Sequence, residues 1–418
     1  MVKAAIIAAL YAPLLRQVLN NRYIQLLPDI IFVLILTILI LHNLIKYPSR
    51  QSSQVIRLRW AAYLFLTISI IQIFNPNIPS LSLGLEGFRK TSLYLIALVV
   101  GTYLNWDEKT IRSLFRFVLI AAMPICLYAF KQIFFPSSFD ALMAARNNAG
   151  ISTLTIFGRS RATSFFSSPF TLGYFGNTIF AIGMFFYANE KKWIYLLTAA
   201  LGAGSVFLSG TRINLVALIV VFLLIFMLFF FTIRRFYVFL RLALFLVPAF
   251  VYAYNSPVVG PLFQSLSPDR ILADQRFLGR FEVYDYAFEK LKDNWFWGYG
   301  MGSAGDTLGV YFTKGEFITS HNMFIKVYFE TGLLGLFAFI AIWVIWLLGN
   351  RRSALRAQAD GLRTIYHLGL IASSVLFING LSGGALDSFP ANVITFLFMG
   401  VTYNSYGSRE FSASRRMG

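Results

Sequence analysis

The sequence predicts an all-α, polytopic membrane protein with about twelve transmembrane helices and a large outer loop that contains an amphipathic helix. Of its 418 residues, 57% are hydrophobic and 13% are charged, and the mean hydropathy is +0.67. A soluble protein needs roughly a quarter of its residues charged. This chain therefore has too few polar side chains to cover a water-facing surface. Apolar stretches close to the roughly 20 residues that span a bilayer recur along its whole length.

The predicted spans follow from these stretches. In order they are Ala4–Leu19, Ile24–Leu44, Trp60–Phe74, Thr91–Leu104, Ser113–Phe135, Phe170–Tyr187, Trp193–Leu208, Ile213–Phe231, Phe236–Tyr254, Asn322–Leu348, Leu362–Asn379 and Phe389–Tyr403. The segment Leu215–Phe231 is the clearest, because it contains no polar side chain. We expect one transmembrane domain over residues 1–418, with 255–321 as an inserted loop between the ninth and tenth spans.

The placement of basic residues predicts the orientation. Lys and Arg gather in the even-numbered connections, such as Arg57 and Arg59 or Arg351 and Arg352, whereas the short connections on the other side hold few. The positive-inside rule then puts both termini in the cytoplasm. The net charge is +18, but no Lys/Arg-rich block is present, so membrane lipids rather than nucleic acid are the expected partners.

Cysteine and histidine are scarce, at one and three residues. A chain with so few soft ligands and no paired aspartates is not expected to bind a structural or catalytic metal. We predict neither a metal site nor a cofactor.

The long outer loop carries an amphipathic pattern. Apolar residues from Phe277 to Leu291 recur at helical spacing, through Phe281, Tyr284 and Phe288, and an aromatic and glycine-rich run, 295–302, follows them. Trp and Tyr favour membrane interfaces, and glycine permits irregular backbone. The run is therefore either an interfacial anchor or a turn that lines a substrate site.

His321, at the outer end of the tenth span, is the candidate general base. His42 and His367 fall near the predicted cytoplasmic ends of their spans. An imidazole titrates near neutrality, where a general base is most effective. The alternative is a histidine that only satisfies an amide or stabilises the helix start.

Several arginines are candidates for binding an anionic group at the outer boundary. They are Arg161, Arg212, Arg276 and Arg280. A guanidinium is permanently charged and offers a planar fork of donors that matches phosphate oxygens, so their convergence would indicate a diphosphate site. The competing interpretation is that each arginine snorkels to lipid headgroups.

Three further ionisable residues are candidates for supporting this site. Lys326 and Glu330 are four residues apart, so they share one face of a helix and can pair. Because ionisable groups are costly at membrane depth, that helix should line protein or a wet cavity. Asp387, in the short outer turn before the last span, is expected to orient His321 or a substrate hydroxyl, or to act only as a turn residue.

The motifs together resemble those of the O-antigen ligase and polymerase superfamily. His321-Asn322, followed after nine residues by Gly332-Leu333, resembles its signature. Similar features are the arginine segment Arg161–Pro169, the short turn Leu208–Arg212, and the arginine helix that runs from Arg280 to Gly300. One departure is Ser167-Ser168-Pro169, where the family pattern has an Asn near the Pro.

The resemblance implies a glycosyltransferase of the bacterial inner membrane with its active site on the periplasmic side. Such an O-antigen ligase moves a glycan from undecaprenyl diphosphate to lipid A-core. Under this interpretation His321 is the base, Arg161, Arg212 and Arg280 bind the diphosphate, Arg276, Asn322, Lys326, Glu330 and Asp387 support them, and transfer is inverting and metal-independent.

Two kinds of alternative stay open. Within the superfamily they are an O-antigen polymerase and a protein O-oligosaccharyltransferase. The latter usually carries extra sequence beyond the last helix, whereas this chain stops about fifteen residues after Tyr403, which favours a ligase. Outside the superfamily, the alternative is a lipid-linked glycan transporter. Transporters tend to place ionisable groups at the bilayer midplane and to show repeated halves, and this sequence shows no repeat.

Overall fold

The fold is known from a computed structural model that describes residues 1–45, 52–104, 107–146, 155–156, 159–230, 255, 275–304, 321–356, 360–381 and 383–404. Most of these residues are helical. The strands among them, β1 (Thr155–Ile156) and β2 (Arg159–Ser160), form one short antiparallel pair. The prediction of an all-α chain is confirmed.

The chain divides into two compact units. Unit 1 consists of Met1–Ala9, Gln25–Phe117 and Arg280–Gly418, and unit 2 of Leu10–Ile24 and Val118–Gly279. The prediction of a single transmembrane domain stays a prediction.

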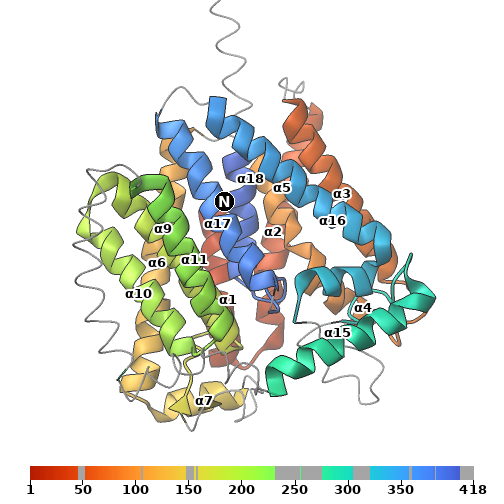
Figure 1. Cartoon of the computed structure of the whole chain (residues 1–418), viewed down its shortest axis with the longest axis horizontal. Coiled ribbons are helices and arrows are strands. Elements are labelled where there is room, and N and C mark those ends of the chain that lie inside the picture. Colours follow the sequence, from red (N-terminus) through yellow and green to blue (C-terminus); the bar gives the residue numbers. More distant parts are fainter. Residues whose placement is uncertain are drawn as a thin grey trace, which may run out of the picture. The chain divides into compact units, whose positions relative to one another are not determined.

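Helices occupy every predicted span except Phe236–Tyr254, which lies outside the described residues. The helices are α1 (Val2–Leu19), η1 (Arg22–Gln25), α2 (Leu26–Ile45), α3 (Ser53–Gln72), α4 (Leu81–Phe88), η2 (Arg89–Leu93), α5 (Leu95–Tyr103), α6 (Glu108–Phe134), α7 (Ser138–Arg146), α9 (Pro169–Glu190), α10 (Trp193–Ser209), α11 (Arg212–Phe230), α15 (Gln275–Asn294), α16 (Met323–Arg356), α17 (Asp360–Leu381) and α18 (Ala391–Asn404) (Figure 1).

Among the described residues, 5 helices are long and apolar enough to cross a membrane. They are α1, α3, α6, α9 and α16, and shorter apolar helices accompany them. This composition is that of a multi-pass membrane protein, while the number of about twelve spans stays a prediction.

The fourth predicted span, Thr91–Leu104, is the one that differs most from the structure. Helix α5 begins only at Leu95 and has 9 residues, which at 1.5 Å per residue is too short to cross a bilayer. The π-helical turn η2 precedes it, and polar side chains of this turn point inward: Thr91 donates to Glu330 at 2.7 Å and Ser92 to Ser69 at 2.8 Å. These inward polar contacts explain why a regular apolar span does not begin at Thr91.

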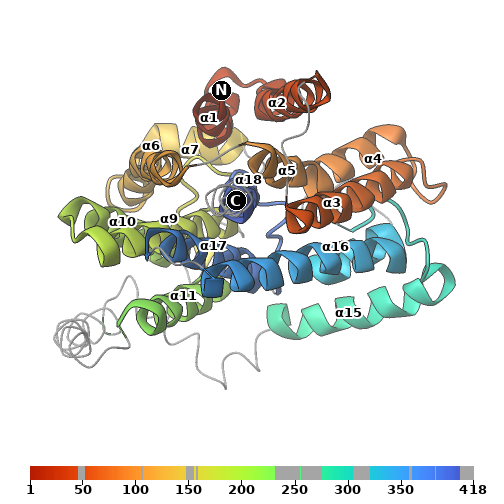
Figure 2. The same ribbon diagram turned by 90° about the horizontal axis from the view of Figure 1, so that it is seen from above.

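Glycines bring α5 and α18 together in unit 1. A Cβ on Gly400 would lie 2.1 Å from the carbonyl oxygen of Leu98, and one on Gly101 would lie 2.7 Å from that of Leu397. Such close approach of backbones through small residues is typical of membrane helices. Helix α18 lies between α5 and α17 (Figure 2), and its residues 391–403 are buried.

Unit 2 uses the same device between α9 and α10. A Cβ on Gly176 would lie 2.6 Å from the carbonyl oxygen of Gly202, and one on Gly183 would lie 2.9 Å from that of Tyr195. Helix α9 begins with a capped turn, because the hydroxyl of Ser168 accepts from the amide of Thr171 at 3.2 Å. The serine that departs from the family pattern therefore has a clear local role as the N-cap.

Candidate functional site

The helix that follows His321 is broken. At Gly332 the backbone of α16 has φ 65° and ψ −168°, which is not helical. Met323–Thr331 forms a first segment, and the long remainder of α16 leaves it at an angle (Figure 1). The sequence predicted one continuous helix over Asn322–Leu348, and the structure corrects this to a short half-helix and a longer one. His321 lies at the start of the short half-helix.

The glycine-rich turn closes this break. The amides of Tyr299 and Gly300 donate to the carbonyl oxygens of Phe329 and Glu330 at 2.7 and 3.0 Å, and the amide of Leu333 donates to Trp295 at 3.0 Å. The turn thus satisfies backbone groups that the interrupted helix leaves without helical partners.

Three glycines allow the turn to fit. Gly298, Gly300 and Gly302 have φ values of 76°, 91° and 88°, which favour glycine. Gln72 at the end of α3 holds the turn from the other side, accepting from the amide of Met301 at 3.1 Å and donating to the carbonyl of Trp297 at 2.7 Å.

The two tryptophans of this turn point outward, whereas the ring of Tyr299 stacks on that of Phe329. Trp295 and Trp297 are 51% and 53% exposed. Of the two interpretations that the sequence left open, these contacts support the interfacial anchor, with the additional role of closing the helix break.

Asn322 caps the half-helix next to His321. Its Oδ1 accepts from the amides of Phe324 and Ile325 at 2.9 and 3.2 Å, and its Nδ2 donates to the carbonyl of Leu381 at 3.0 Å. The capping role that the sequence left open for His321 is therefore filled by its neighbour. The bond to Leu381 also ties the start of the half-helix to the end of α17. His321 itself is half-buried.

Buried charges anchor the half-helix further along. Lys326, which is 3% exposed, forms an ion pair with Asp387, and this partner was not predicted from the sequence. Glu330 is 0% exposed, and its carboxylate accepts from the hydroxyl of Thr91 at 2.7 Å and the amide of Gly302 at 3.1 Å.

These contacts bear on the predicted roles of the three residues. Asp387 lies against Lys326, rather than in the predicted contact with His321, because the half-helix turns its lysine toward the loop before α18. Lys326 and Glu330 support the half-helix, as the sequence indicated, but each does so through a partner distant in the chain. One oxygen of Asp387, Oδ2, is buried without a hydrogen-bond partner.

Helix α15 packs on the half-helix through a face that shares Leu291 with the predicted stripe. Ala287 and Leu291 are buried against Phe329 and Ala304. Phe281 and Phe288, which belong to the predicted stripe, are 51% and 50% exposed. The helix has apolar residues on two faces, of which one packs on protein and the other points outward.

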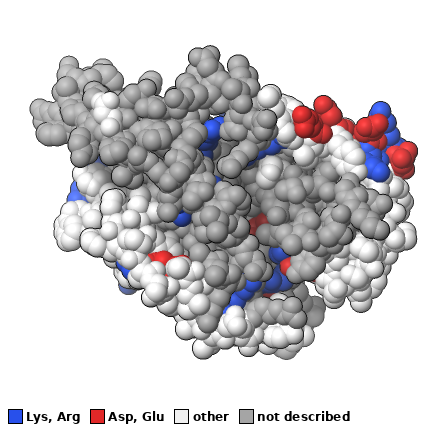
Figure 3. All heavy atoms as spheres, turned by 90° about the horizontal axis from the view of Figure 1, so that it is seen from below, with Lys and Arg blue, Asp and Glu red and all other residues white. Residues whose placement is uncertain are grey.

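Arg280 lies on α15 and is half-buried, whereas the side chain of Arg276 lies outside the described residues. Side chains of both charges gather where the C-terminal end of α15 lies (Figure 3). There the helix carries Glu289, Lys290, Lys292 and Asp293.

In unit 2, Arg161 lies against the turn that precedes Arg212. Its Nε donates to the carbonyl of Ser209 at 2.8 Å and its Nη2 to the hydroxyl of Thr211 at 2.8 Å. Arg212 is the first residue of α11. The structure thus brings the arginine segment and the short Ser/Thr-Arg turn together, as two of the resembling motifs require.

Sequence reasoning missed the residue that holds the arginine segment. Gln132 of α6 accepts from the amides of Thr163 and Ser164 at 3.1 and 2.7 Å and donates to the carbonyl of Ser164 at 3.3 Å. The available signal was a glutamine near the end of the predicted span Ser113–Phe135. Thr91, the partner of Glu330, was missed for the same reason, because an isolated threonine in an apolar segment carries little information.

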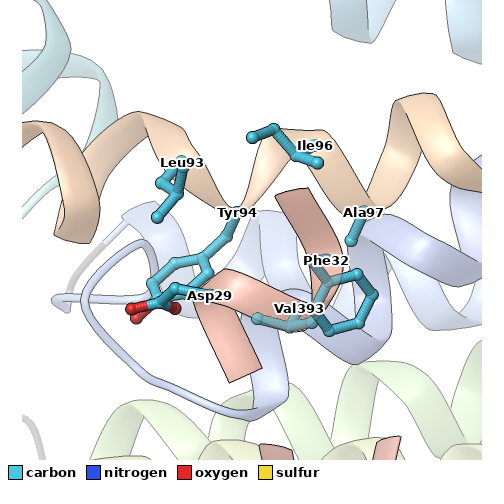
Figure 4. Close-up of a pocket in the computed structure, with 7 residues that line it drawn as sticks. All are labelled: Asp29, Phe32, Leu93, Tyr94, Ile96, Ala97 and Val393. Atoms are coloured by element: carbon cyan, nitrogen blue, oxygen red, sulfur yellow. The ribbon is translucent and has the colours of Figure 1, made fainter. Parts of the chain in front are cut away.

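A small pocket in unit 1 lies apart from the predicted site residues (Figure 4). It is lined by Asp29, Phe32, Leu93, Tyr94, Ile96, Ala97 and Val393. The lining is apolar except for Asp29, which pairs with Arg89, and the phenol of Tyr94. None of the predicted catalytic or diphosphate-binding residues lines it.

Within the described part of the chain, no three His, Cys, Asp or Glu side chains gather as a metal site would require. The predicted chemistry uses an imidazole and guanidinium groups, which need no metal to accept a proton or to neutralise an anion.

Comparison with known proteins finds a family similarity over part of the chain. Residues 197–340 match the family model described as O-antigen ligase. This segment contains Arg212, Arg280, His321 and the broken part of α16, while Arg161 and Asp387 lie outside it. A search of curated proteins finds no match to the chain. Family members are membrane glycosyltransferase-like enzymes that act on O-antigen. Residues 197–340 of this chain are therefore similar to the O-antigen ligase family, and the apolar helices are those of a multi-pass membrane protein.

Proposed function

We propose that the chain is an O-antigen ligase, which transfers a glycan from undecaprenyl diphosphate to lipid A-core at the periplasmic face of the bacterial inner membrane. The observation that carries the proposal is the half-helix that begins beside His321. It is capped by Asn322 and anchored by Lys326 and Glu330 inside the segment that matches the family. A catalytic base needs such a fixed support, because general-base catalysis depends on geometry before it depends on proton affinity.

The reaction forms one bond and breaks one. The oxygen of an acceptor hydroxyl attacks the anomeric carbon of the donor sugar, the bond from that carbon to the phosphate oxygen breaks, and undecaprenyl diphosphate leaves with the electron pair. His321 accepts the proton of the hydroxyl, which contributes about 10²- to 10⁴-fold in rate. Attack opposite the leaving group predicts inversion at the anomeric carbon.

The leaving diphosphate gains negative charge as the bond breaks. Arg212 and Arg280, assisted by Arg161, are proposed to stabilise this charge in the transition state, where fixed cationic donors are most effective. No step of the proposal uses a metal, so we expect activity to survive chelation with EDTA.

The proposal is tested with purified protein in detergent, carrier-linked glycan and three separate acceptors: lipid A-core, a second carrier-linked glycan, and a peptide rich in Ser and Thr. A ligase forms covalent product with lipid A-core. Product only with the second carrier-linked glycan would identify a polymerase, and product only with the peptide a protein-directed transferase. Absence of any covalent product, together with movement of carrier-linked glycan across vesicles, would indicate a transporter instead.

Variants of Arg280 distinguish diphosphate binding from snorkelling to lipid headgroups. Reversal of charge in Arg280→Glu should raise the KM for the carrier-linked donor far more than Arg280→Lys, which keeps the charge. Equal activity of the two variants would show that Arg280 contacts only lipid headgroups.

A further inference from the structure

The turn before Arg212 determines where that residue begins its helix. Helix α10 ends at Ser209, and Gly210 has a left-handed φ of 59°, which is typical of a helix C-terminus. Helix α11 begins at Arg212. Only Gly210 and Thr211 connect the two helices, so the direction of Arg212 depends on the conformation of these residues.

Arg161 holds this turn on both sides of Gly210. Its Nε bonds to the carbonyl of Ser209 before the glycine, and its Nη2 bonds to the hydroxyl of Thr211 after it. The amide of Ala162 adds a third bond, to the carbonyl of Leu208 at 2.9 Å. A Cβ on Gly210 would lie 3.4 Å from Nε of Arg161, so the arginine side chain lies over the glycine.

The arginine is itself held in place from behind. Gln132 bonds to the backbone of Thr163 and Ser164, and the hydroxyl of Ser164 donates to the carbonyl of Ile125 at 2.7 Å. Ser164 also has a positive φ of 51°, a conformation that such surrounding contacts must stabilise. The segment after Arg161 is therefore fixed on α6.

The two bonds also use the edge of the guanidinium that is best suited to bind an anion. The Nε and Nη2 hydrogens are parallel, and together they form the side-on fork that binds a carboxylate or phosphate through two oxygens. In Arg161 this edge is directed at the turn. Its charge also lies beside the last carbonyl of α10, where a cation is favourable.

We infer that Arg161 is a positioning residue, which locks the Ser209–Gly210–Thr211 turn so that Arg212 is presented to the diphosphate. The inference rests on the proposed role of Arg212 and deepens it, by giving Arg161 an indirect part in place of a direct contact with the carrier. Lysine cannot replace this arginine, since an ammonium has no planar fork to span the two acceptors.

Hydrogen–deuterium exchange of the intact protein in detergent tests the lock without any substrate. The variants are Arg161→Lys, which keeps the charge, and Thr211→Val, which keeps the shape but removes the acceptor. Both should speed exchange of the amides over residues 208–213 by about tenfold. Arg112→Lys is the matched control, because Arg112 pairs with Glu108 one helical turn away on α6, and it should leave these amides unchanged. If exchange is unaltered in both variants, Arg161 does not hold the turn.

A kinetic cycle tests whether the lock acts through Arg212. Alone, Arg161→Lys should lower kcat/KM for transfer to lipid A-core about 10- to 100-fold. In an Arg212→Lys background it should add less than about twofold, since a residue that acts through Arg212 has no separate effect once Arg212 is altered. If Arg161→Lys lowers kcat/KM by the same factor in that background, Arg161 does not act through Arg212, and a direct contact of Arg161 with the diphosphate is supported instead.

The two experiments fail independently. If the wild-type protein transfers glycan to no acceptor, the proposed function is wrong, while the exchange data still decide whether Arg161 holds the turn.

Discussion

Replacing Gly332 with alanine tests the broken helix directly. Its φ of 65° and ψ of −168° lie in a region that is essentially restricted to glycine, and placing another residue there costs about 1 to 3 kcal/mol. The added Cβ would lie 2.1 Å from the carbonyl oxygen of Phe296, so the glycine-rich turn must move away. If the bond from Leu333 to Trp295 is lost, the unpaired groups cost about another 1 to 3 kcal/mol.

The expected loss in the free energy of unfolding is therefore about 2 to 6 kcal/mol. It is measured by denaturant titration in detergent micelles, with tryptophan fluorescence as the signal, because Trp295 and Trp297 belong to the turn that moves. Gly279→Ala is the matched control. No atom lies within 4 Å of a Cβ built on Gly279, and alanine favours its helix, so stability should hold or rise by about 0.5 to 1 kcal/mol. A Gly332→Ala variant as stable as wild type would refute the closure of the break by this turn.

Three further predictions concern other anchors. Asp387→Ala removes the ion-pair partner of the buried Lys326 and should cost about 3 to 5 kcal/mol in unfolding experiments, whereas the double variant Lys326→Met, Asp387→Leu should recover most of it; equal losses would contradict a buried pair. Gln132→Leu removes the acceptor of two amides and should lower stability by about 1 to 3 kcal/mol, and an unchanged unfolding curve would argue against its role. Burial raises the pKa of Asp140, but hydrogen bonds from Lys131, Tyr128 and Ser137 outweigh it and lower the pKa to about 2. Its contribution to stability is therefore complete above its unfolded pKa of about 4 and is lost as pH falls from there toward 2. Asp140→Asn should abolish this part of the acid dependence.

Hydropathy predicted the membrane helices because a helix that is buried in lipid or protein needs a long apolar run. It also found the start of α16 next to His321, since a polar pair before an apolar run is typical of a helix start. These features are local, so each can be recognised from a single segment of the sequence.

The supports of the candidate site were not predictable in this way. The break at Gly332 is stable only because the turn of Tyr299 and Gly300 supplies its missing partners, and a glycine alone inside an apolar run does not reveal them. Thr91, which bonds to Glu330, likewise lies far from it in the sequence.

The role of Arg161 likewise could not be predicted from its residue type. The sequence placed it correctly beside a family motif and before a helix. It did not show that the guanidinium faces the Ser209 turn, because side-chain direction depends on contacts with residues distant in the chain, such as that of Gln132 with Thr163. Charge alone indicated an anion site, whereas the contacts indicate a lock.

The rate of glycan transfer by His321→Ala, in a single turnover with saturating donor and lipid A-core, tests the central claim most directly. The account predicts a fall of about 10²- to 10⁴-fold with the fold preserved, while His42→Ala, a change at the exposed end of α2, keeps the wild-type rate. A His321→Ala rate within about threefold of wild type, far less than a base contributes, would contradict the account.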